Sequence, residues 1–202
     1  MRLYVLRHGK TPWNKEKRFQ GQTNIPLAEE GVSLARKIGV GMKDVKIDYC
    51  FSSPLARAVN TAVLVLGDRD IPVVADDLIK EISFGELEGK CVLPGTDVDE
   101  EYMKKFYEDP FNCPPGKGGE TFMELCDRAK SFTDKLIADP KYKDASILIS
   151  CHGACGRAIL NAFSDTPEDF WLGRVPKNCA VSIIDIDENG TGKITELDHM
   201  YA

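Results

Sequence analysis

No run of apolar residues in this chain is long enough to cross a lipid bilayer, and the chain has no excess of positive charge. A membrane-spanning helix needs about 20 consecutive apolar residues, so we expect no membrane span. The 202 residues include 26 Lys and Arg against 32 Asp and Glu, a net charge of -6. This balance argues against a nucleic-acid surface and against attraction to anionic membranes. A positive field for an anionic ligand would have to be local, built from a few converging cations.

The chain also lacks a disulfide framework, because its seven cysteines are odd in number and scattered. We expect reduced thiols in a cytoplasmic protein. Cys151 and Cys155 flank His152, but a metal site needs further ligands at matching spacing and the sequence offers none, so no metal is expected. The chain runs directly into the apolar segment Leu3 to Leu6, so we expect no signal peptide.

Apolar segments of strand and helix type alternate along the chain, which favours an α/β layered sheet. We predict one domain over residues 1–202, without internal repeats. Strands are expected over 3–6, 49–51, 71–74, 145–150, 181–186 and 193–197, with a short extended piece at 78–79. Helices are expected over 26–42, 54–66, 100–108, 122–138 and 153–163.

Two sequence patterns mark the starts of helices. Ser53 is a good N-cap and Pro54 a good first helical residue. Thr121 and Glu124 form a capping box. The stretch 85–119 is the least regular and holds four prolines. We predict that it is a lid-like insertion over the active edge of the sheet and not a second domain.

Two of the three histidines follow apolar strands and precede a glycine. His8 comes after Arg7 at the end of the first strand, and His152 ends the strand near residue 150. Open α/β sheets place their chemistry at such strand ends. A histidine fixed beside a permanent cation suits an anionic substrate, above all a phosphate.

Phosphoryl transfer through a histidine needs a nucleophilic nitrogen, donors for the non-bridging oxygens and an acid for the leaving oxygen. His8 is the candidate nucleophile, and Gly9 would let a bulky anion approach the backbone. Arg7 and Arg57 are the candidate phosphate clamps. Arg57 lies near the start of a helix whose amino end, at Ser53, would add free N–H groups.

The remaining candidates are neutral donors and an acid. His152 is expected to face the same pocket as His8, with Gly153 beside it as a further phosphate-binding residue. Asn14 is either a phosphate donor or a turn-forming residue. Glu81 is the candidate acid, although local chemistry does not choose among Glu81, Glu86 and Glu88.

Together these residues resemble the histidine phosphatase superfamily, in its phosphoglycerate-mutase-like branch, over nearly the whole chain. The matching motifs are Arg7-His8-Gly9-x-Thr11-x-Trp13-Asn14, Gln20-Gly21 with Pro26-Leu27, Ser52-Ser53-Pro54-Leu55-x-Arg57-Ala58-x-x-Thr61-Ala62, Glu81 with Phe84-Gly85 and Glu88-Gly89, Gly118-Gly119-Glu120-Thr121, and Ser150-Cys151-His152-Gly153.

The resemblance implies a three-layer α/β/α sandwich with a mostly parallel sheet. It implies that His8 is the phosphohistidine nucleophile and that Glu81 is the proton donor. The phosphate ligands it implies are Arg7, Arg57, His152 and Asn14. It also implies that the reaction needs no metal and no cofactor.

We therefore expect a metal-independent phosphomonoester hydrolase. Mutases of this family are longer and carry paired arginines in their insertion, whereas residues 91–119 here contain lysines and no arginine. A cofactor-dependent phosphoglycerate mutase and a catalytically degenerate phosphate-binding protein are the alternatives.

The expected partner is a small phosphorylated metabolite, with no nucleic acid and no membrane, and a homodimer is left open. Phe170-Trp171-x-x-Arg174-Val175 with Cys179-Ala180 looks similar to the α-ribazole phosphatases. An α-ribazole 5'-phosphate phosphatase, a sugar-phosphate phosphatase and a broad-specificity phosphomonoesterase are equally admissible.

Overall fold

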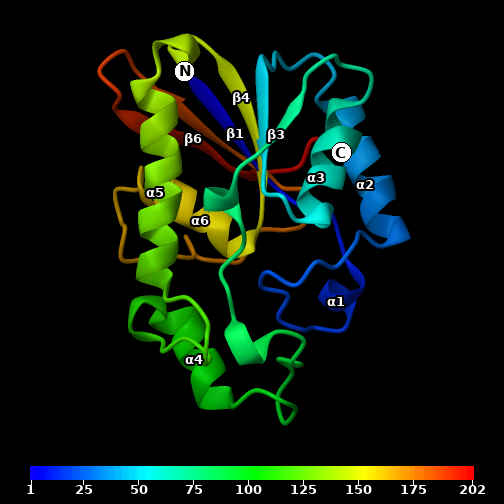
Figure 1. The fold of residues 1–202 in the computed structure, drawn as a ribbon, viewed down its shortest axis with the longest axis vertical. Helices are drawn as coiled ribbons and strands as arrows, with labels where there is room; N and C mark the ends of the chain where they lie inside the picture. The colour runs from blue at the N-terminus through cyan, green and yellow to red at the C-terminus, as the bar shows by residue number, and fades with distance from the viewer.

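The computed structural model describes residues 1–202 and shows one six-stranded sheet with helices on both faces (Figure 1). The strand order is β3-β2-β4-β1-β5-β6. The strands are β1 (Arg2–Arg7), β2 (Tyr49–Ser52), β3 (Val73–Ala75), β4 (Ser146–Cys151), β5 (Val181–Ile186) and β6 (Gly192–His199). β1 to β4 pair in parallel, and β5 and β6 join antiparallel at one edge. The expected mostly parallel sheet is confirmed.

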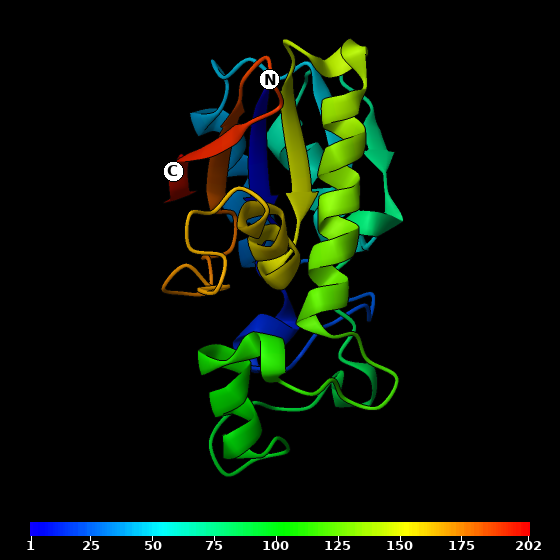
Figure 2. The same ribbon diagram turned by 90° about the vertical axis from the view of Figure 1, so that its left-hand side faces the viewer.

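Helices cover both faces of this sheet, as the two perpendicular views show (Figures 1 and 2). One face carries α2 and α3, and the other carries α5 and α6. The helices are α1 (Pro12–Lys15), α2 (Glu29–Gly41), α3 (Ala56–Leu66), α4 (Glu100–Glu108), α5 (Phe122–Ala138) and α6 (Gly153–Asn161). α5 begins at the predicted capping box, where Thr121 and Glu124 cap each other.

The central strand β1 is apolar from Leu3 to Leu6 because both of its faces are buried there. Leu3 and Val5 belong to a core cluster of 27 buried residues that includes the inner sides of α5 and α6. Tyr4 and Leu6 point the other way, into a cluster of 14 buried residues beneath α2 and α3. Alternate strand residues face opposite sides, so a strand between two helical layers has no polar face.

Two local predictions were wrong. α3 begins at Ala56 and not at Pro54, because Leu55 keeps an extended backbone (ψ 131) and is the N-cap residue. Residues 78–79 lie in a 3₁₀ helix, Asp77–Ile79, and are not extended, because the Asp76 carboxylate accepts the Leu78 N–H (2.8 Å) and closes a turn.

Several element ends differ from prediction by two or three residues. β3 begins at Val73, α2 begins at Glu29, and α6 ends at Asn161.

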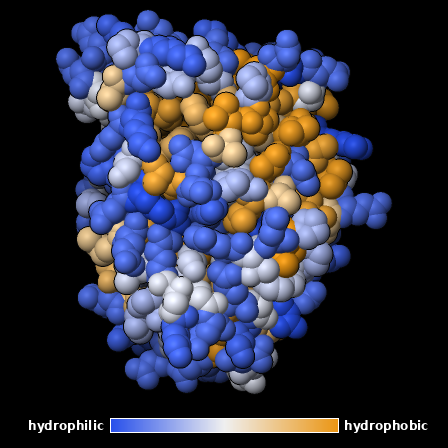
Figure 3. Space-filling model, viewed as in Figure 1, coloured by the Kyte–Doolittle hydropathy of each residue, from blue (hydrophilic) through white to orange (hydrophobic).

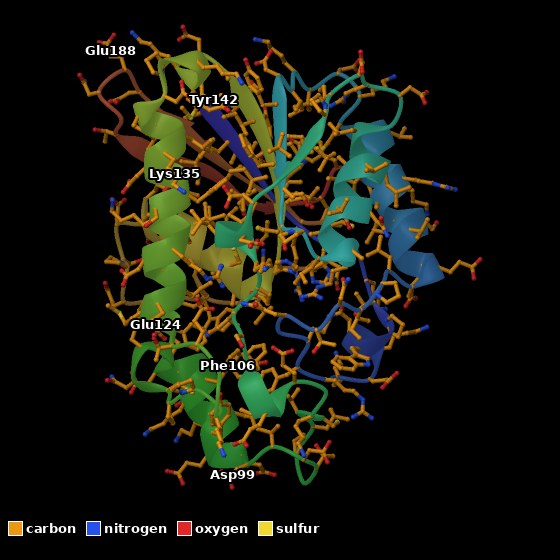
Figure 4. All side chains as sticks on the ribbon, in the orientation of Figure 1. Asp99, Phe106, Glu124, Lys135, Tyr142 and Glu188 are labelled. Atoms are coloured by element: carbon orange, nitrogen blue, oxygen red, sulfur yellow. The ribbon has the colours of Figure 1, made fainter.

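The stretch 85–119 lies beyond the carboxyl ends of the parallel strands (Figures 1 and 2). It is held to the rest of the chain through Phe106 of α4. The labelled Phe106 lies at the end of α4 nearest the sheet, and Asp99 at the far end (Figure 4). The Phe106 ring packs against Phe19 and Trp171, and the Trp171 Nε1–H donates to its carbonyl (2.9 Å).

Exposed apolar side chains gather on the surface near the β3 edge of the sheet, whereas the half that holds the insertion is mostly hydrophilic (Figure 3). Val63 of α3 and Val74 of β3 are among the exposed apolar residues. None of the helices is both long and apolar enough to span a membrane.

A buried ion pair joins the last strand to α6. The Arg157 guanidinium donates to the Asp198 carboxylate at 2.6 Å, and their side chains are 0% and 3% exposed. Arg157 also donates to the Arg174 carbonyl (2.8 Å), which holds the segment that leads into β5. Removing one partner of such a pair leaves an uncompensated buried charge.

Asp198→Ala is therefore expected to lower the free energy of unfolding by about 3–5 kcal/mol. The matched control is Asp185→Ala, which breaks the exposed pair with Arg2 (37% and 49% exposed). That change should lower the free energy of unfolding by less than about 1 kcal/mol. Urea unfolding of both variants measures the difference, and equal losses would contradict a stabilising buried pair.

Candidate active site

A cavity of about 420 Å³ opens at the carboxyl ends of β1 and β4. Six of the seven predicted site residues line it: Arg7, His8, Asn14, Arg57, Glu81 and Gly153. The seventh, His152, does not line the cavity and is fully buried beside it, with its ring 5.2 Å from that of His8. The parallel pairing of β1 with β4 brings the two strand ends together.

The backbone around His8 is held on three sides. The His8 N–H donates to the Cys151 carbonyl (2.9 Å), and the Asn178 amide donates to the His8 carbonyl (3.0 Å). The Gly9 N–H donates to the Thr61 hydroxyl (2.9 Å). A Cβ at Gly9 would lie 2.9 Å from the Gly31 carbonyl oxygen. Glycine is therefore needed at position 9 because the backbone passes so close to α2. The predicted reason was different, namely access of an anion to the backbone.

The hydrogen bonds of His8 fix its neutral tautomer. Its Nδ1 lies 2.6 Å from the Gly9 carbonyl oxygen. A carbonyl can only accept, so Nδ1 carries the proton and the lone pair is on Nε2. A neutral His8 thus has a nucleophilic nitrogen at Nε2.

His152 takes the opposite tautomer. The Arg57 Nε–H donates to its Nδ1 at 3.2 Å. A guanidinium can only donate, so Nδ1 holds a lone pair and the proton of a neutral His152 is on Nε2. The Nε2 atom has no hydrogen-bond partner within the protein. One imidazole is therefore arranged as a nucleophile and the other as a donor.

Burial and neighbouring cations keep both rings neutral. Burial, followed by Arg57 and Arg7, holds the pKa of His8 well below its ordinary value of 6.5. Burial and then Arg57 act in the same direction on the pKa of His152. Desolvation and like charge both disfavour an imidazolium.

Backbone carbonyls hold the two guanidinium groups. Arg57 is fully buried and donates to the carbonyls of Gly21 (2.6 Å) and Thr23 (2.8 Å). Arg7 donates to the Pro176 carbonyl through Nη1. Burial lowers the pKa of Arg57 to about 10, which leaves it charged at neutral pH. Carbonyls satisfy these donors without cancelling their charge.

Glu81 occupies the amino end of α6. Its Oε2 accepts the N–H groups of Gly153 (3.0 Å) and Ala154 (3.3 Å), and its Oε1 accepts that of Cys155 (3.0 Å). Helix amino ends favour negative charge. The helix therefore positions the Glu81 carboxylate at the cavity wall, and the Gly153 N–H predicted for phosphate is engaged by it. Glu86 is exposed and does not line the cavity, and neither does Glu88.

The amino end of α3 was wrongly predicted to bind phosphate. Ser53 is fully buried and does not line the cavity. Its hydroxyl accepts the Leu55 N–H (3.3 Å), and the Asn24 side chain accepts the Ala56 N–H (2.9 Å). The N–H groups of Leu55 and Ala56 at this helix end are thus already paired within the protein.

Asn14 has the turn-forming role that was left open. Its Oδ1 accepts the Thr11 N–H (3.0 Å) and caps the short helix α1. Asn14 also lines the cavity, so both roles are compatible with its position.

Sequence reasoning missed the apolar wall of the cavity and the polar lining residues Asn178, Lys17 and Arg18. Asn178 also holds the His8 carbonyl. The apolar and aromatic lining residues are Trp13, Phe19, Phe84, Val92, Phe106, Tyr107, Ala154, Trp171 and Val175. They come from distant segments, and only Trp13, Phe84, Trp171 and Val175 lay in motifs. No group of three or more His, Cys, Asp or Glu side chains is placed to hold a metal ion.

Residues 3–197 match the family model described as the histidine phosphatase superfamily (branch 1). The chain belongs to the histidine phosphatase superfamily. The resemblance inferred from the motifs is confirmed.

Relatives in this family carry both phosphatase and mutase names. The uncharacterized phosphatase PhoE of Bacillus subtilis is 33% identical over 89% of this chain and 86% of that protein. The 2,3-bisphosphoglycerate-dependent phosphoglycerate mutase 2 of Gloeobacter violaceus is 33% identical over 78% of this chain and 73% of its own. An Arabidopsis thaliana protein named "Probable 2-carboxy-D-arabinitol-1-phosphatase" is 29% identical over 95% of this chain, which spans only 39% of that protein.

Solved structures confirm the phosphoglycerate-mutase-like α/β fold. Bacillus stearothermophilus YhfR has a TM-score of 0.89 and 31% identity, covering 99% of this chain and 98% of its own. The α-ribazole phosphatase of Shigella flexneri has a TM-score of 0.84 and 27% identity, covering 99% and 97%. A phosphoglycerate mutase of Bacillus anthracis has a TM-score of 0.83 and 27% identity, covering 100% and 94%.

The lowered pKa values of the histidines predict how stability varies with pH. In the unfolded chain these imidazoles bind protons below about 6.5, whereas in the folded protein they do not. The unfolded state therefore binds more protons below that pH, and the free energy of unfolding falls as the pH drops further.

His152→Asn removes one of these groups. Between about pH 6.5 and 5.5 its free energy of unfolding should fall less steeply than that of the wild type, by up to about 1.4 kcal/mol per pH unit. Urea unfolding at several pH values gives both slopes. Parallel slopes would mean that His152 takes up its proton equally in both states.

Proposed function

We propose that the chain is a metal-independent phosphomonoester hydrolase that transfers a phosphoryl group first to His8 and then to water. The observation that carries this proposal is the opposite tautomers of His8 and His152 beside the fully buried Arg57 and the partly buried Arg7. A lone pair on one ring and a donor on the other suit attack on a phosphorus atom and stabilisation of its oxygens.

In the first step the His8 Nε2 lone pair attacks phosphorus, the N–P bond forms, and the bond from phosphorus to the ester oxygen breaks. Arg7, Arg57 and the His152 Nε2–H stabilise the charge on the non-bridging oxygens. Because His8 stays neutral at physiological pH, no proton has to leave Nε2 before attack. Positioning of the reacting groups and electrostatic stabilisation account for most of the catalysis of phosphoryl transfer.

Glu81 is the proton donor in this scheme. Its contact with the Gly153 N–H places it where a phosphate would also be held. Two negative groups at one helix end repel, so binding of a phosphate dianion favours a Glu81 that carries a proton. Glu81 gives this proton to the leaving oxygen, so an alcohol departs.

The second step returns the enzyme to its starting state. A water molecule attacks the phosphohistidine, Glu81 takes one of its protons, and the N–P bond breaks to release inorganic phosphate. Glu81 is again protonated and the lone pair returns to His8 Nε2. Acid and base roles thus alternate on one carboxyl group.

The lining of the cavity supports hydrolysis of an apolar ester over mutase activity. Beyond Arg7 and Arg57, the lining cations are Lys10, Lys17 and Arg18. Arg18 is already bound to the Glu16 carboxylate (2.6 Å) and the Gly89 carbonyl (2.7 Å). No pair of arginines is free there for a sugar-acid carboxylate, and aromatic side chains make up much of the remaining wall.

An aromatic wall suits a leaving group with a planar apolar part. We propose a small phosphorylated metabolite of this kind as substrate, with α-ribazole 5'-phosphate ahead of sugar phosphates. The α-ribazole phosphatase among the solved structures supports this order.

His8→Ala tests the proposed nucleophile. Hydrolysis of p-nitrophenyl phosphate should fall by about three orders of magnitude or more, as for removal of other covalent nucleophiles. EDTA should leave the wild-type rate unchanged. A variant that keeps its rate would rule out His8 as nucleophile, and an inactive wild type that still binds phosphate would indicate the degenerate phosphate-binding protein.

Glu81→Gln tests the proposed acid. For an alkyl phosphate the rate should fall by about 10²-fold or more, because the alkoxide then leaves without a proton. For p-nitrophenyl phosphate the first-turnover release of nitrophenol should fall much less, because that anion leaves unaided, whereas steady-state turnover also falls because the phosphohistidine then loses its base. Equal losses of the first-turnover rate with both substrates would assign Glu81 a role other than proton donation.

A substrate panel tests the proposed class. The wild type is expected to show a higher kcat/KM for α-ribazole 5'-phosphate and aryl phosphates than for sugar phosphates. With 3-phosphoglycerate and its bisphosphorylated cofactor it should release phosphate and form little 2-phosphoglycerate. Rapid formation of 2-phosphoglycerate without hydrolysis would make the chain a mutase.

A further inference from the structure

We propose that Glu88 is a positioning residue that sets the geometry of Arg57 through the backbone of residues 21–23. Glu88 does not line the cavity, and its carboxylate is bound to backbone N–H groups of this loop instead. The inference rests on the proposed phosphate transfer at this site, in which Arg57 holds the phosphoryl group.

The Glu88 carboxylate binds the outer side of this loop. Its Oε1 accepts the Gln22 N–H (2.9 Å), and its Oε2 accepts the Thr23 N–H (2.9 Å) and the Thr23 hydroxyl. Oε1 also accepts the Phe84 N–H (3.3 Å). One carboxylate thus ties two consecutive loop amides to the segment that carries Glu81.

The same loop binds Arg57 through its carbonyls. Gly21 and Thr23 offer their oxygens to Nη2 and Nη1 of Arg57, at 2.6 and 2.8 Å. The loop therefore presents N–H groups to Glu88 and carbonyls to Arg57. Because the Gln22 N–H and the Gly21 carbonyl belong to one planar peptide unit, fixing this N–H also fixes the direction of that carbonyl toward Arg57.

Gly21 shows how closely the loop approaches Glu88. Its φ is +52, and a Cβ there would lie 2.0 Å from the Glu88 Oε1. Only glycine combines this left-handed backbone with so short a contact. The motif residue Gly21 is thus explained by the position of Glu88.

The backbone of Glu88 is itself held firmly. The next residue, Gly89, donates its N–H to the Phe19 carbonyl (2.8 Å) and accepts from Arg18 (2.7 Å). The carboxylate therefore starts from a fixed backbone. A positioning residue must be better fixed than the group it positions.

The negative charge of Glu88 also favours the charged form of Arg57, in addition to the contacts that its carboxylate makes to the loop. Burial lowers the pKa of Arg57, whereas Glu81 and Glu88 raise it and Arg7 lowers it again. Of the two carboxylates, Glu81 faces the cavity and Glu88 lies behind the loop. A neutral residue 88 would weaken both the loop contacts and the compensation of the Arg57 charge.

Glu88→Gln tests the proposal, with Glu86→Gln as the matched control. Glu86 lies two residues away, is exposed and does not line the cavity. Calorimetric titration with inorganic phosphate should show a Kd about tenfold higher for Glu88→Gln, as expected when buried amides lose their charged acceptor. Glu86→Gln should bind phosphate like the wild type. KM for p-nitrophenyl phosphate should rise with the phosphate Kd.

The coupling to Arg57 separates positioning from general structural support. In an Arg57→Lys background, Glu88→Gln should change the phosphate Kd by less than about twofold, because the group that it positions is gone. The same tenfold effect in both backgrounds would overturn the proposal. Thr23→Val, which removes only the hydroxyl contact, gives a second test and should raise the Kd by a smaller factor.

Phosphate binding and hydrolysis distinguish the two proposals. A wild type that binds phosphate but hydrolyses nothing would refute the proposed function, and the effect of Glu88→Gln on the Kd would still decide the role of Glu88. An active wild type whose Kd and KM are unchanged by Glu88→Gln would refute the positioning role alone.

Discussion

The site depends on the hydrogen bond from the Arg57 Nε–H to the His152 Nδ1, made where neither group reaches water. Placing a permanent cation against an imidazole makes that imidazole an acceptor and keeps it neutral. The proton of His152 is then confined to Nε2. His8 next to it is kept neutral by the same charge and takes the opposite tautomer through the Gly9 carbonyl.

The guanidinium groups of Arg7 and Arg57 donate to neutral acceptors. Because the carbonyls of Gly21, Thr23 and Pro176 accept hydrogen bonds without a negative charge, the positive field at the cavity persists in a chain whose net charge is -6. Glu81 lines the cavity but is held by the first turn of α6. An oxyanion that entered would meet preorganised donors, which is the condition for electrostatic catalysis.

Much of this arrangement could be predicted from local sequence. Strand-terminal residues such as Arg7 and His8 could be placed together with Gly153 because carboxyl ends of parallel strands share one edge of a sheet. The start of α3 could not be predicted, because Leu55 stays extended and the Ala56 N–H donates to Asn24 of a distant segment. The roles of Gly9 and Glu88, the buried partners Arg157 and Asp198, and the aromatic wall likewise depend on contacts between distant segments. The pattern of neighbouring residues in the sequence does not predict such contacts.

The most direct test of the account is to trap the enzyme during turnover. Rapid mixing with a phosphomonoester, quenching in base and digestion should give one phosphorylated peptide, with its phosphate on the His8 imidazole. The nitrogen–phosphorus bond should be stable to base and labile to acid, as expected for a phosphohistidine. Rapid turnover with no phosphorylated His8, or with phosphate on another side chain, would contradict the central claim that this imidazole is the nucleophile.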